Sequence, residues 1–206
     1  MIYLTLFTSS LLSYFFLIIT RDYFIKNKII DKINKRSSHR ITAVRSGGLG
    51  IFIPIILISI YFYIVGVEIF DFSFLIPLLI LLLIGVYDDT SDADYKLKFI
   101  FQIIAAKIII DNGLVIDNLH GIFGIESIGR VPAQSLTIFI ILAIINSVNF
   151  IDGIDGLATS IILFLIISFE IFSTGKSDFL ILSIIVVGSL LPLLFFNYQK
   201  NKKIFL

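Results

Sequence analysis

Seven long apolar runs, separated by short polar segments, dominate this sequence of 206 residues. A helix that crosses a bilayer needs about 20 mostly apolar residues. Hydrophobic side chains make up 58% of the chain and charged ones 15%, against about 45–50% and roughly 25% in soluble domains. A soluble domain of this size has too little interior to bury so much apolar surface, so we expect lipid to be the main solvent. The runs are Ile2–Thr20, Gly47–Gly66, Phe72–Tyr87, Leu97–Ile110, Pro132–Ser147, Leu157–Phe172 and Phe179–Phe196.

Isoleucine and phenylalanine are abundant in these runs, a composition that would favour strands in a soluble protein. In lipid, however, each segment must satisfy its own backbone hydrogen bonds, and this favours helices. The sequence therefore predicts an all-α, polytopic membrane bundle of about seven transmembrane helices, forming a single membrane domain over residues 1–206. The first run lacks a basic start and a small-residue cleavage site, so we expect it to be a helix and not a signal peptide.

The distribution of basic residues predicts the orientation of these helices. If the seven runs alternate in direction, all but three of the 16 Lys and Arg residues fall on one side; the exceptions are Lys107, Arg130 and Lys176. Positive loops face the cytoplasm, which predicts an outer N-terminus and a cytoplasmic C-terminus. The net charge of +1 argues against a nucleic-acid partner, and the absence of cysteine excludes thiolate metal sites and disulfides.

Directly after the third run stand four acidic residues: Asp88, Asp89, Asp92 and Asp94. Carboxylates in a membrane chain are costly, about 2.5–3.5 kcal/mol each at mid-bilayer, so their position is informative. Neighbouring carboxylates repel one another unless a cation compensates them. A divalent ion or the pair Lys96 and Lys98 would do so. The alternative is a solvated acidic loop that caps the next helix.

The second polar cluster follows the fifth run, where oxygen-bearing side chains recur at every third position: Asn146, Asn149, Asp152 and Asp155. On a helical path they would form one stripe, and Gly153 and Gly156 would break the helix and admit a ligand close to the backbone. Oxygen ligands of this kind suit a hard cation such as Mg²⁺. The alternative is a polar turn between two spans.

Other charged residues have two interpretations each. His39 and Arg45, at the cytoplasmic start of the second run, would hold an anionic group, or would reflect only the attraction of basic residues to anionic lipid, about 1 kcal/mol each. Lys107 and Asp111, four residues apart, predict a mutual ion pair, with a proton relay as the alternative. The segment Gly113–Val131 is predicted to be an outer loop or a small hairpin.

Three motifs, in order, resemble a known family. Residues 85–92 (GVYDDTSD) are similar to its DDxxD motif, and residues 146–157 (NSVNFIDGIDGL) to its NxxNxxDGxDGL signature. Residues 36–48 resemble its RSSH…PTPRxGG segment, although Thr42-Ala43-Val44 replaces the proline-containing residues. The chain thus resembles the N-terminal portion of the polyprenyl-phosphate N-acetylhexosamine-1-phosphate transferases, glycosyltransferase family 4, of the undecaprenyl-phosphate GlcNAc-1-phosphate transferase type. The family's later GDxGS motif is not in the sequence, so we expect the chain to be truncated before it.

The resemblance implies transfer of a sugar-1-phosphate from a UDP-N-acetylhexosamine to a polyprenyl phosphate, with release of UMP. It implies Mg²⁺, or Mn²⁺ in its place, at the cytoplasmic face of a bacterial inner membrane, as the first membrane step of cell-wall or O-antigen synthesis. Implied catalytic residues are Asp88, Asp89, Asp152 and Asp155, and implied metal ligands are Asn149, Asp88 and Asp89. Implied substrate contacts are His39, Arg45, Asp92, Asn146, Asn197 and Phe205. The partners are the nucleotide sugar, the polyprenyl phosphate and membrane lipid, and a homodimer stays open.

Two alternatives remain at this point. The chain is an inactive fragment of such an enzyme, or it is an ion-coupled transporter. Broken helices and membrane carboxylates are typical of transporters, but these place their acids near mid-bilayer. Here both acidic clusters lie at one predicted face, which favours the transferase.

Overall fold

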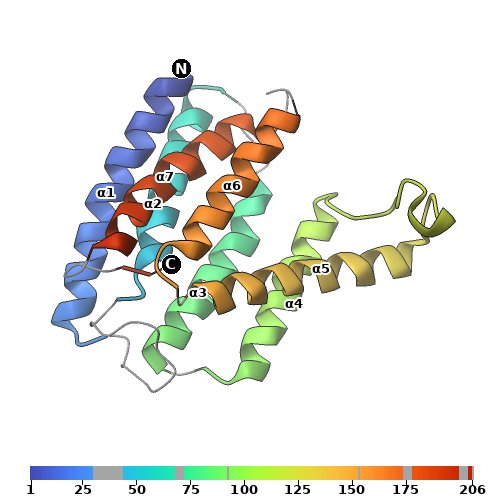
Figure 1. The fold of residues 1–206 in the computed structure, drawn as a ribbon, viewed down its shortest axis with the longest axis horizontal. Helices are drawn as coiled ribbons and strands as arrows, with labels where there is room; N and C mark the ends of the chain where they lie inside the picture. Colours follow the sequence, from blue (N-terminus) through green and yellow to red (C-terminus); the bar gives the residue numbers. More distant parts are fainter. Residues whose placement is uncertain are drawn as a thin grey trace. The chain divides into compact units, whose positions relative to one another are not determined.

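The computed structural model describes residues 1–29, 44–67, 72–91, 93–152, 154–173, 178–199 and 204–205. These residues form seven α-helices, and each predicted apolar run overlaps one of them (Figure 1). Two short 3-10 helices, η1 (Phe72–Phe74) and η2 (Ile122–Gly124), complete the described elements. The helices are α1 (Ile2–Lys26), α2 (Gly47–Ile64), α3 (Leu75–Ser91), α4 (Tyr95–Asp111), α5 (Arg130–Ile151), α6 (Leu157–Phe172) and α7 (Leu180–Tyr198).

Four of these helices, α1, α2, α5 and α7, are long and apolar enough to cross a membrane. The helices α3 and α4 have 17 residues each and α6 has 16, so they fall short of the 18 residues that the four longer helices reach. Strand pairing in the described residues is confined to two isolated bridges, Val44 with Ile204 and Asn118 with Ser127. The all-helical class is confirmed, whereas seven crossings and the orientation of the termini stay predictions.

The chain divides into two compact units, residues 1–71 with 149–206 and residues 72–148. The predicted single membrane domain stays a prediction. In the first unit, α1 packs against α2 and α7, and α7 also contacts α2 and α6 (Figure 1). In the second unit, α3 and α4 pack on each other, and most of α5 belongs to the same unit.

The buried face of α1 is made mostly of small polar side chains, together with Leu17, Arg21 and Phe24. Thr5, Ser9, Ser13 and Thr20 are buried, and the Ser13 hydroxyl donates a hydrogen bond to the Ser189 carbonyl of α7 at 2.7 Å. Small side chains let two helix backbones approach closely, as is common where lipid removes the hydrophobic drive between helices. A Cβ built on Gly188 of α7 would lie 1.9 Å from the Ser9 Oγ.

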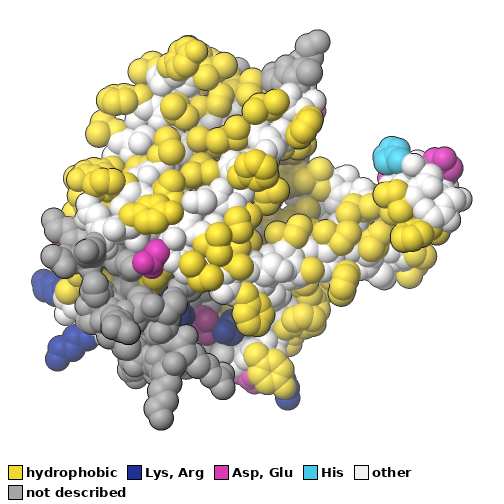
Figure 2. Space-filling model, viewed as in Figure 1, with side chains coloured by type: hydrophobic (Ala, Val, Ile, Leu, Met, Phe, Trp, Pro, Cys, Tyr) yellow, Lys and Arg dark blue, Asp and Glu magenta, His cyan; other side chains and the backbone are white. Residues whose placement is uncertain are grey.

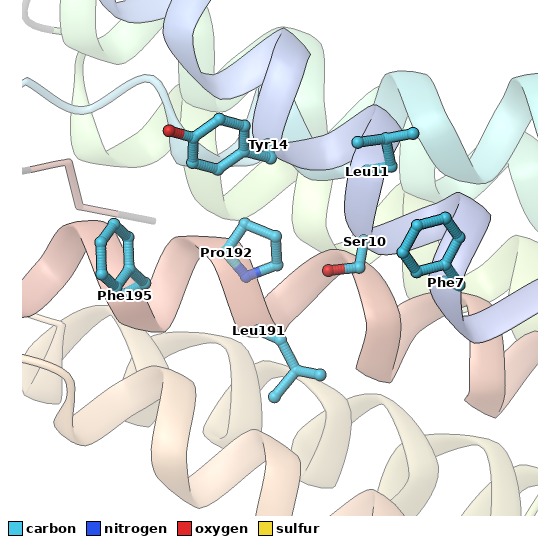
Figure 3. A pocket seen from close by; sticks show the side chains of 7 residues that line it. All are labelled: Phe7, Ser10, Leu11, Tyr14, Leu191, Pro192 and Phe195. Carbon is cyan, nitrogen blue, oxygen red and sulfur yellow. The ribbon is translucent and has the colours of Figure 1, made fainter. Parts of the chain in front are cut away.

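Many large apolar side chains of the first unit point outward, although others, such as Leu17, Phe52 and Phe196, are buried. Figure 2 shows hydrophobic side chains spread over the visible face of its helices, where a soluble protein would carry polar ones. On this surface α1 and α7 leave a cavity of about 460 Å³, with Tyr14 and Leu11 on one side and Pro192 and Phe195 on the other (Figure 3). The outward apolar surface agrees with lipid as the surrounding solvent.

In the second unit, the hairpin alternative for Gly113–Val131 is confirmed, and the outer location of this segment stays a prediction. Asn118 and Ser127 form an antiparallel bridge, and the tip between them contains η2. The backbone N–H of Ile116 donates to the Thr137 hydroxyl of α5 at 2.9 Å, which fastens the segment before the hairpin to that helix.

Candidate functional site

Asp88 and Asp89 lie on α3 itself, because the helix continues to Ser91 beyond the predicted end of the apolar run. The Oδ1 atom of Asp88 lies 2.8 Å from the Lys98 Nζ and accepts a hydrogen bond from the Ala93 N–H at 3.1 Å. Lys98 is therefore a cation that compensates Asp88; it belongs to the lysine pair that the sequence offered as the alternative to a divalent ion. The ammonium group of the other, Lys96, lies 5.9 Å from the centre of the Tyr95 ring.

The rest of this acidic cluster has more than one role. Asp94 is the N-cap of α4, and its side chain accepts a hydrogen bond from the Lys96 backbone N–H at 3.2 Å. For Asp94 the helix-capping alternative is thus confirmed. Asp89 is half-buried. Asp92 lies outside the described residues.

One face of α4 contacts the first carboxylate of one motif and the first carboxamide of the other. Lys98 contacts Asp88 of α3, and one turn later the Gln102 Oε1 accepts a hydrogen bond from the Asn146 Nδ2 of α5 at 3.0 Å. Four residues span about 6 Å along a helix axis. The helix therefore holds the first carboxylate of one motif and the first carboxamide of the other on adjacent turns. Gln102 is buried. Its spacing of four from Lys98 is the sequence feature that places both side chains on the same face of α4.

The second motif begins on a helix and ends in a turn. The helix α5 continues to Ile151, which places Asn146 and Asn149 on the helix and Asp152 and Asp155 after it. Asn149 and Asp155 are exposed and Asp152 is half-buried. The predicted single stripe of four oxygen-bearing side chains thus holds only for the part on the helix.

Gly156 ends this turn in the left-handed conformation, with φ of +68°, and is the N-cap of α6. A Cβ at this position would lie 2.8 Å from the ring of Tyr198. The group that approaches the backbone here is the Tyr198 ring of the same chain, and the predicted approach of a ligand stays a prediction.

Asn197, which the resemblance assigns to substrate contact, is buried in the described structure, with 1% of its surface exposed. Its Oδ1 accepts hydrogen bonds from the Gly156 N–H at 3.2 Å and the Thr159 hydroxyl at 3.4 Å. Its Nδ2 donates to the Ile204 carbonyl. These contacts fasten the end of the Asp152–Gly156 turn to α7 and to the C-terminal segment.

That C-terminal segment also pairs with the residues that precede α2. Val44 and Ile204 form a parallel bridge, Phe205 N–H donates to the Val44 carbonyl, and Gly47 N–H donates to the Phe205 carbonyl, both at 2.9 Å. The side chain of Phe205 is buried, and that of Arg45 is exposed. His39 lies outside the described residues. Asn197 and the pairing of Val44 with Ile204 thus join three segments that the sequence assigned to the site.

A further cation lies near this junction and was missed in the sequence. Arg21 of α1 is 9% exposed, pairs with Asp22 at 2.7 Å, and lies over the ring of Phe196 at 5.9 Å from its centre. The signal for its burial was its place beside Thr20, at the end of the polar face of α1. The predicted pair of Lys107 and Asp111 is confirmed as an ion pair between half-exposed or exposed side chains.

A metal site stays a prediction. Within the described ranges, no three side chains of His, Cys, Asp or Glu gather closely enough to hold an ion. The donor chemistry nevertheless fits a hard cation, because Asp88, Asp89 and Asn149 would each bind a metal through oxygen. Asp88 and Asp152 belong to different units, and their meeting stays a prediction as well.

Comparison with known proteins adds the family. A model of glycosyl transferase family 4 matches residues 71–206, which contain both acidic motifs. This chain belongs to glycosyl transferase family 4. The predicted family is thereby confirmed.

Several curated relatives within family 4 are similar to this chain. The "Probable undecaprenyl-phosphate N-acetylglucosaminyl 1-phosphate transferase" of Bacillus subtilis is 32% identical over 182 residues, which are 86% of this chain and 50% of that protein. The decaprenyl-phosphate N-acetylglucosaminephosphotransferase of Mycobacterium leprae is 31% identical over 132 residues, 58% of this chain and 33% of that protein. The undecaprenyl-phosphate alpha-N-acetylglucosaminyl 1-phosphate transferase of Yersinia pestis is 25% identical over 202 residues, 96% of this chain and 53% of that protein.

The chain therefore spans about half the length of the family 4 relatives it matches in Bacillus subtilis and Yersinia pestis. The names of these relatives all refer to a polyprenyl phosphate and to the phosphate of N-acetylglucosamine. The individual roles of the site residues stay predictions.

Proposed function

We propose that this chain carries the N-terminal half of a transferase that moves an N-acetylhexosamine-1-phosphate from its UDP derivative to a polyprenyl phosphate. The observation that carries the proposal is the family match over residues 71–206, because it includes both oxygen-rich motifs. The bonds from Lys98 to Asp88 and from Gln102 to Asn146 support it, since α4 holds the first carboxylate of one motif and the first carboxamide of the other.

The proposed reaction is a phosphoryl transfer. An oxygen of the polyprenyl phosphate attacks the β-phosphorus of the UDP-sugar, the bond from that phosphorus to the bridging oxygen breaks, and UMP leaves. Such reactions ask the protein chiefly to position the two phosphates and to offset the negative charge that spreads over them.

Asp88 is the residue that we assign to orient or deprotonate the lipid phosphate, with Asp89 beside it. Among the described residues, both contacts of Asp88 go to its Oδ1 atom. The Oδ2 atom is therefore the one left to face a phosphate or a metal. Lys98 fixes the carboxylate and adds positive charge near the reacting phosphate.

Asn149, Asp88 and Asp89 are our candidates to hold Mg²⁺ or Mn²⁺, and Asp152 and Asp155 support the metal or the nucleotide. A divalent ion supplies charge neutralisation across the diphosphate when it is bound. Asn149 is exposed on α5, so its carboxamide oxygen is accessible to an ion.

The remaining assignments concern substrate contact. We assign the phosphates to Arg45 and His39, and the nucleotide or sugar to Asn146, Asp92, Asn197 and Phe205. Asn197 and Phe205 are buried in the described structure, so their contribution is first to shape the junction around Gly156. The site would face the cytoplasm at the inner membrane of a bacterium, where a lipid phosphate lies at headgroup depth.

The test uses membranes that contain the full chain, alone and together with the C-terminal half of the Bacillus subtilis relative. Radiolabelled UDP-GlcNAc and undecaprenyl phosphate are added, and label in the lipid fraction is measured with and without Mg²⁺. We expect transfer in the completed enzyme, dependent on Mg²⁺, and none with the chain alone.

The matched controls are Asp88→Asn, which is expected to abolish transfer, and Asp111→Asn, which removes an exposed carboxylate outside the site. Ion-driven uptake by sealed vesicles without transfer would favour a transporter. Near wild-type transfer by Asp88→Asn would refute the role of that residue, and no transfer by a correctly inserted, completed enzyme would refute the function. Cross-linking of the same membranes reports whether two copies associate.

A further inference from the structure

The hairpin between α4 and α5 presents an apolar tip that the transferase function does not use. Its exposed side chains are Phe123, with 94% of its surface exposed, Ile122, with 59%, and Ile125, with 41%. Figure 2 shows hydrophobic side chains on this hairpin, beside His and acidic side chains at its end. Between Leu119 and Ile125 the one ionisable side chain is that of His120, and the acidic Asp117 and Glu126 flank this tip in the sequence.

Most backbone N–H groups of this tip have partners within the hairpin. Of the seven residues Leu119–Ile125, six donate their N–H to an acceptor inside the hairpin, including Leu119 to the Glu126 carbonyl at 2.7 Å and Gly121 to the Ile125 carbonyl at 3.0 Å. Irregular backbone enters a low-dielectric region only where its polar groups have partners, because an unsatisfied group there costs several kcal/mol. The six bonded N–H groups of this tip meet that requirement, whereas the N–H of Phe123 has no partner among the described residues.

The backbone conformation keeps the apolar side chains turned outward. Phe123 and His120 have φ of +57° and +49°, a region that side chains other than glycine rarely adopt. The hydrogen bonds of Gly121 and Gly124 on either side hold this turn in place. A large aromatic side chain kept fully exposed in such a conformation calls for an apolar surface to cover it.

The short connection between the hairpin tip and α5 points to the membrane as that apolar surface. Ile125 is five residues from Arg130, where the candidate membrane-spanning helix α5 begins. Five extended residues reach at most about 17 Å, and the headgroup layer adds roughly 5–8 Å to each side of the hydrocarbon core. The tip is thus tethered within reach of the bilayer. We propose that Phe123, Ile122 and Ile125 insert into the headgroup and acyl-chain boundary of the membrane beside α5, with Asp117 and Glu126 left in water.

The sequence offers clean probes for this proposal, because it contains no cysteine and no tryptophan. The full chain is placed in nanodiscs as Phe123→Cys, labelled with an environment-sensitive dye, and compared with Asp117→Cys at the base of the same hairpin. We expect blue-shifted emission at position 123, quenching by lipids that carry a nitroxide high on the acyl chain, and protection from aqueous iodide. At position 117 we expect the opposite pattern.

The variant Phe123→Trp keeps an aromatic side chain and repeats the measurement with brominated lipids if the cysteine variant folds poorly. Equal iodide quenching at positions 117 and 123 would overturn the proposal. Protection at 123 that disappears when each disc holds one copy would also overturn it, because the tip would then cover a second chain. Insertion is a property of the hairpin alone, so it is independent of whether the chain supports transfer.

Discussion

The side chain of Asn197 on α7 accepts a hydrogen bond from the backbone N–H of Gly156 at 3.2 Å, across 41 positions of sequence. The same side chain donates to the Ile204 carbonyl, so a single buried carboxamide holds the turn before α6 and the C-terminal segment. This contact connects the shape of the DGxDG turn to residues that lie far from it in sequence.

Replacing Asn197 with Leu is expected to lower the free energy of unfolding by about 1–3 kcal/mol, because the Gly156 N–H and the Ile204 carbonyl would stay buried without this partner. Thermal unfolding in detergent measures the loss. The matched variant Asn149→Ala removes an exposed carboxamide and should leave the unfolding temperature unchanged while it abolishes transfer by the completed enzyme. If both variants unfold like the wild type, the structural role of Asn197 is wrong.

Lys98→Met is expected to reduce transfer by the completed enzyme roughly ten- to hundredfold, since a hydrogen bond to a charged group contributes about 1.5–3 kcal/mol and 1.4 kcal/mol is a factor of ten. Lys96→Met, two residues away, should have little effect. Stability should change little in either case, because partly exposed ion pairs contribute about 0–1 kcal/mol. Initial rates at saturating substrate decide the matter, and equal rates for the two variants would contradict the role of Lys98.

Gly188→Ala is expected to destabilise the protein strongly. Its Cβ would lie 1.9 Å from the Ser9 Oγ and 2.7 Å from the Leu6 carbonyl oxygen, so α1 and α7 would have to separate. Gly85→Ala is the matched control on α3, where a Cβ meets nothing within 4 Å. There the substitution should stabilise the helix by roughly 0.5–1 kcal/mol. If urea or thermal unfolding shows that Gly188→Ala is more stable than Gly85→Ala, this packing of α1 on α7 is wrong.

Gly156→Ala tests the turn before α6. Both Gly156→Ala and Gly113→Ala incur the cost of a left-handed backbone, about 1–2 kcal/mol, because the φ values are +68° and +93°. Only position 156 adds a clash, with the ring of Tyr198 at 2.8 Å. We therefore expect a larger loss of stability at 156, together with a loss of transfer. An equal loss of stability at both positions would show that the Tyr198 ring moves aside without an energetic cost.

Lys107→Gln and Asp111→Asn test the alternative of a proton relay. Their ion pair joins side chains that are 43% and 59% exposed, so each substitution should change stability by less than about 1 kcal/mol. Transfer by the completed enzyme should be retained in both variants. A pH-dependent loss of transfer in either variant would support the proton-relay alternative.

Much of the helical architecture was accessible from the sequence because apolar runs in lipid have few options. The runs predicted α1 to α7, and the errors lie at their polar ends, where helical hydrogen bonding continues beyond the apolar stretch. Thus α1 extends to Lys26, and α3 takes in Asp88 and Asp89. The composition of a run indicates where lipid ends, whereas the end of a helix depends on capping groups such as Asp94.

The residues of the candidate site were predicted by type, but most of their partners were not. The link from Lys98 to Asp88 was one of two options, and a spacing of four on one helix was the signal for Gln102. The partners of Asn197 depend on tertiary contacts between positions 156, 197 and 204, and no local pattern indicates them. Its assignment to substrate contact came from the resemblance and stays a prediction.

The bond from Ser13 to the Ser189 carbonyl joins residues 176 positions apart. During synthesis, α1 enters the membrane before α7 has been made. The hydroxyl groups on its buried face therefore lack their packing partner at first. Thr5, Ser9 and Thr20 bond to carbonyls of their own helix in the meantime, but Ser13 gains its partner on Ser189 only once α7 has been inserted. The packing face of α1 is thus completed only after α7 has been made, and the insertion machinery must tolerate its hydroxyl groups until then.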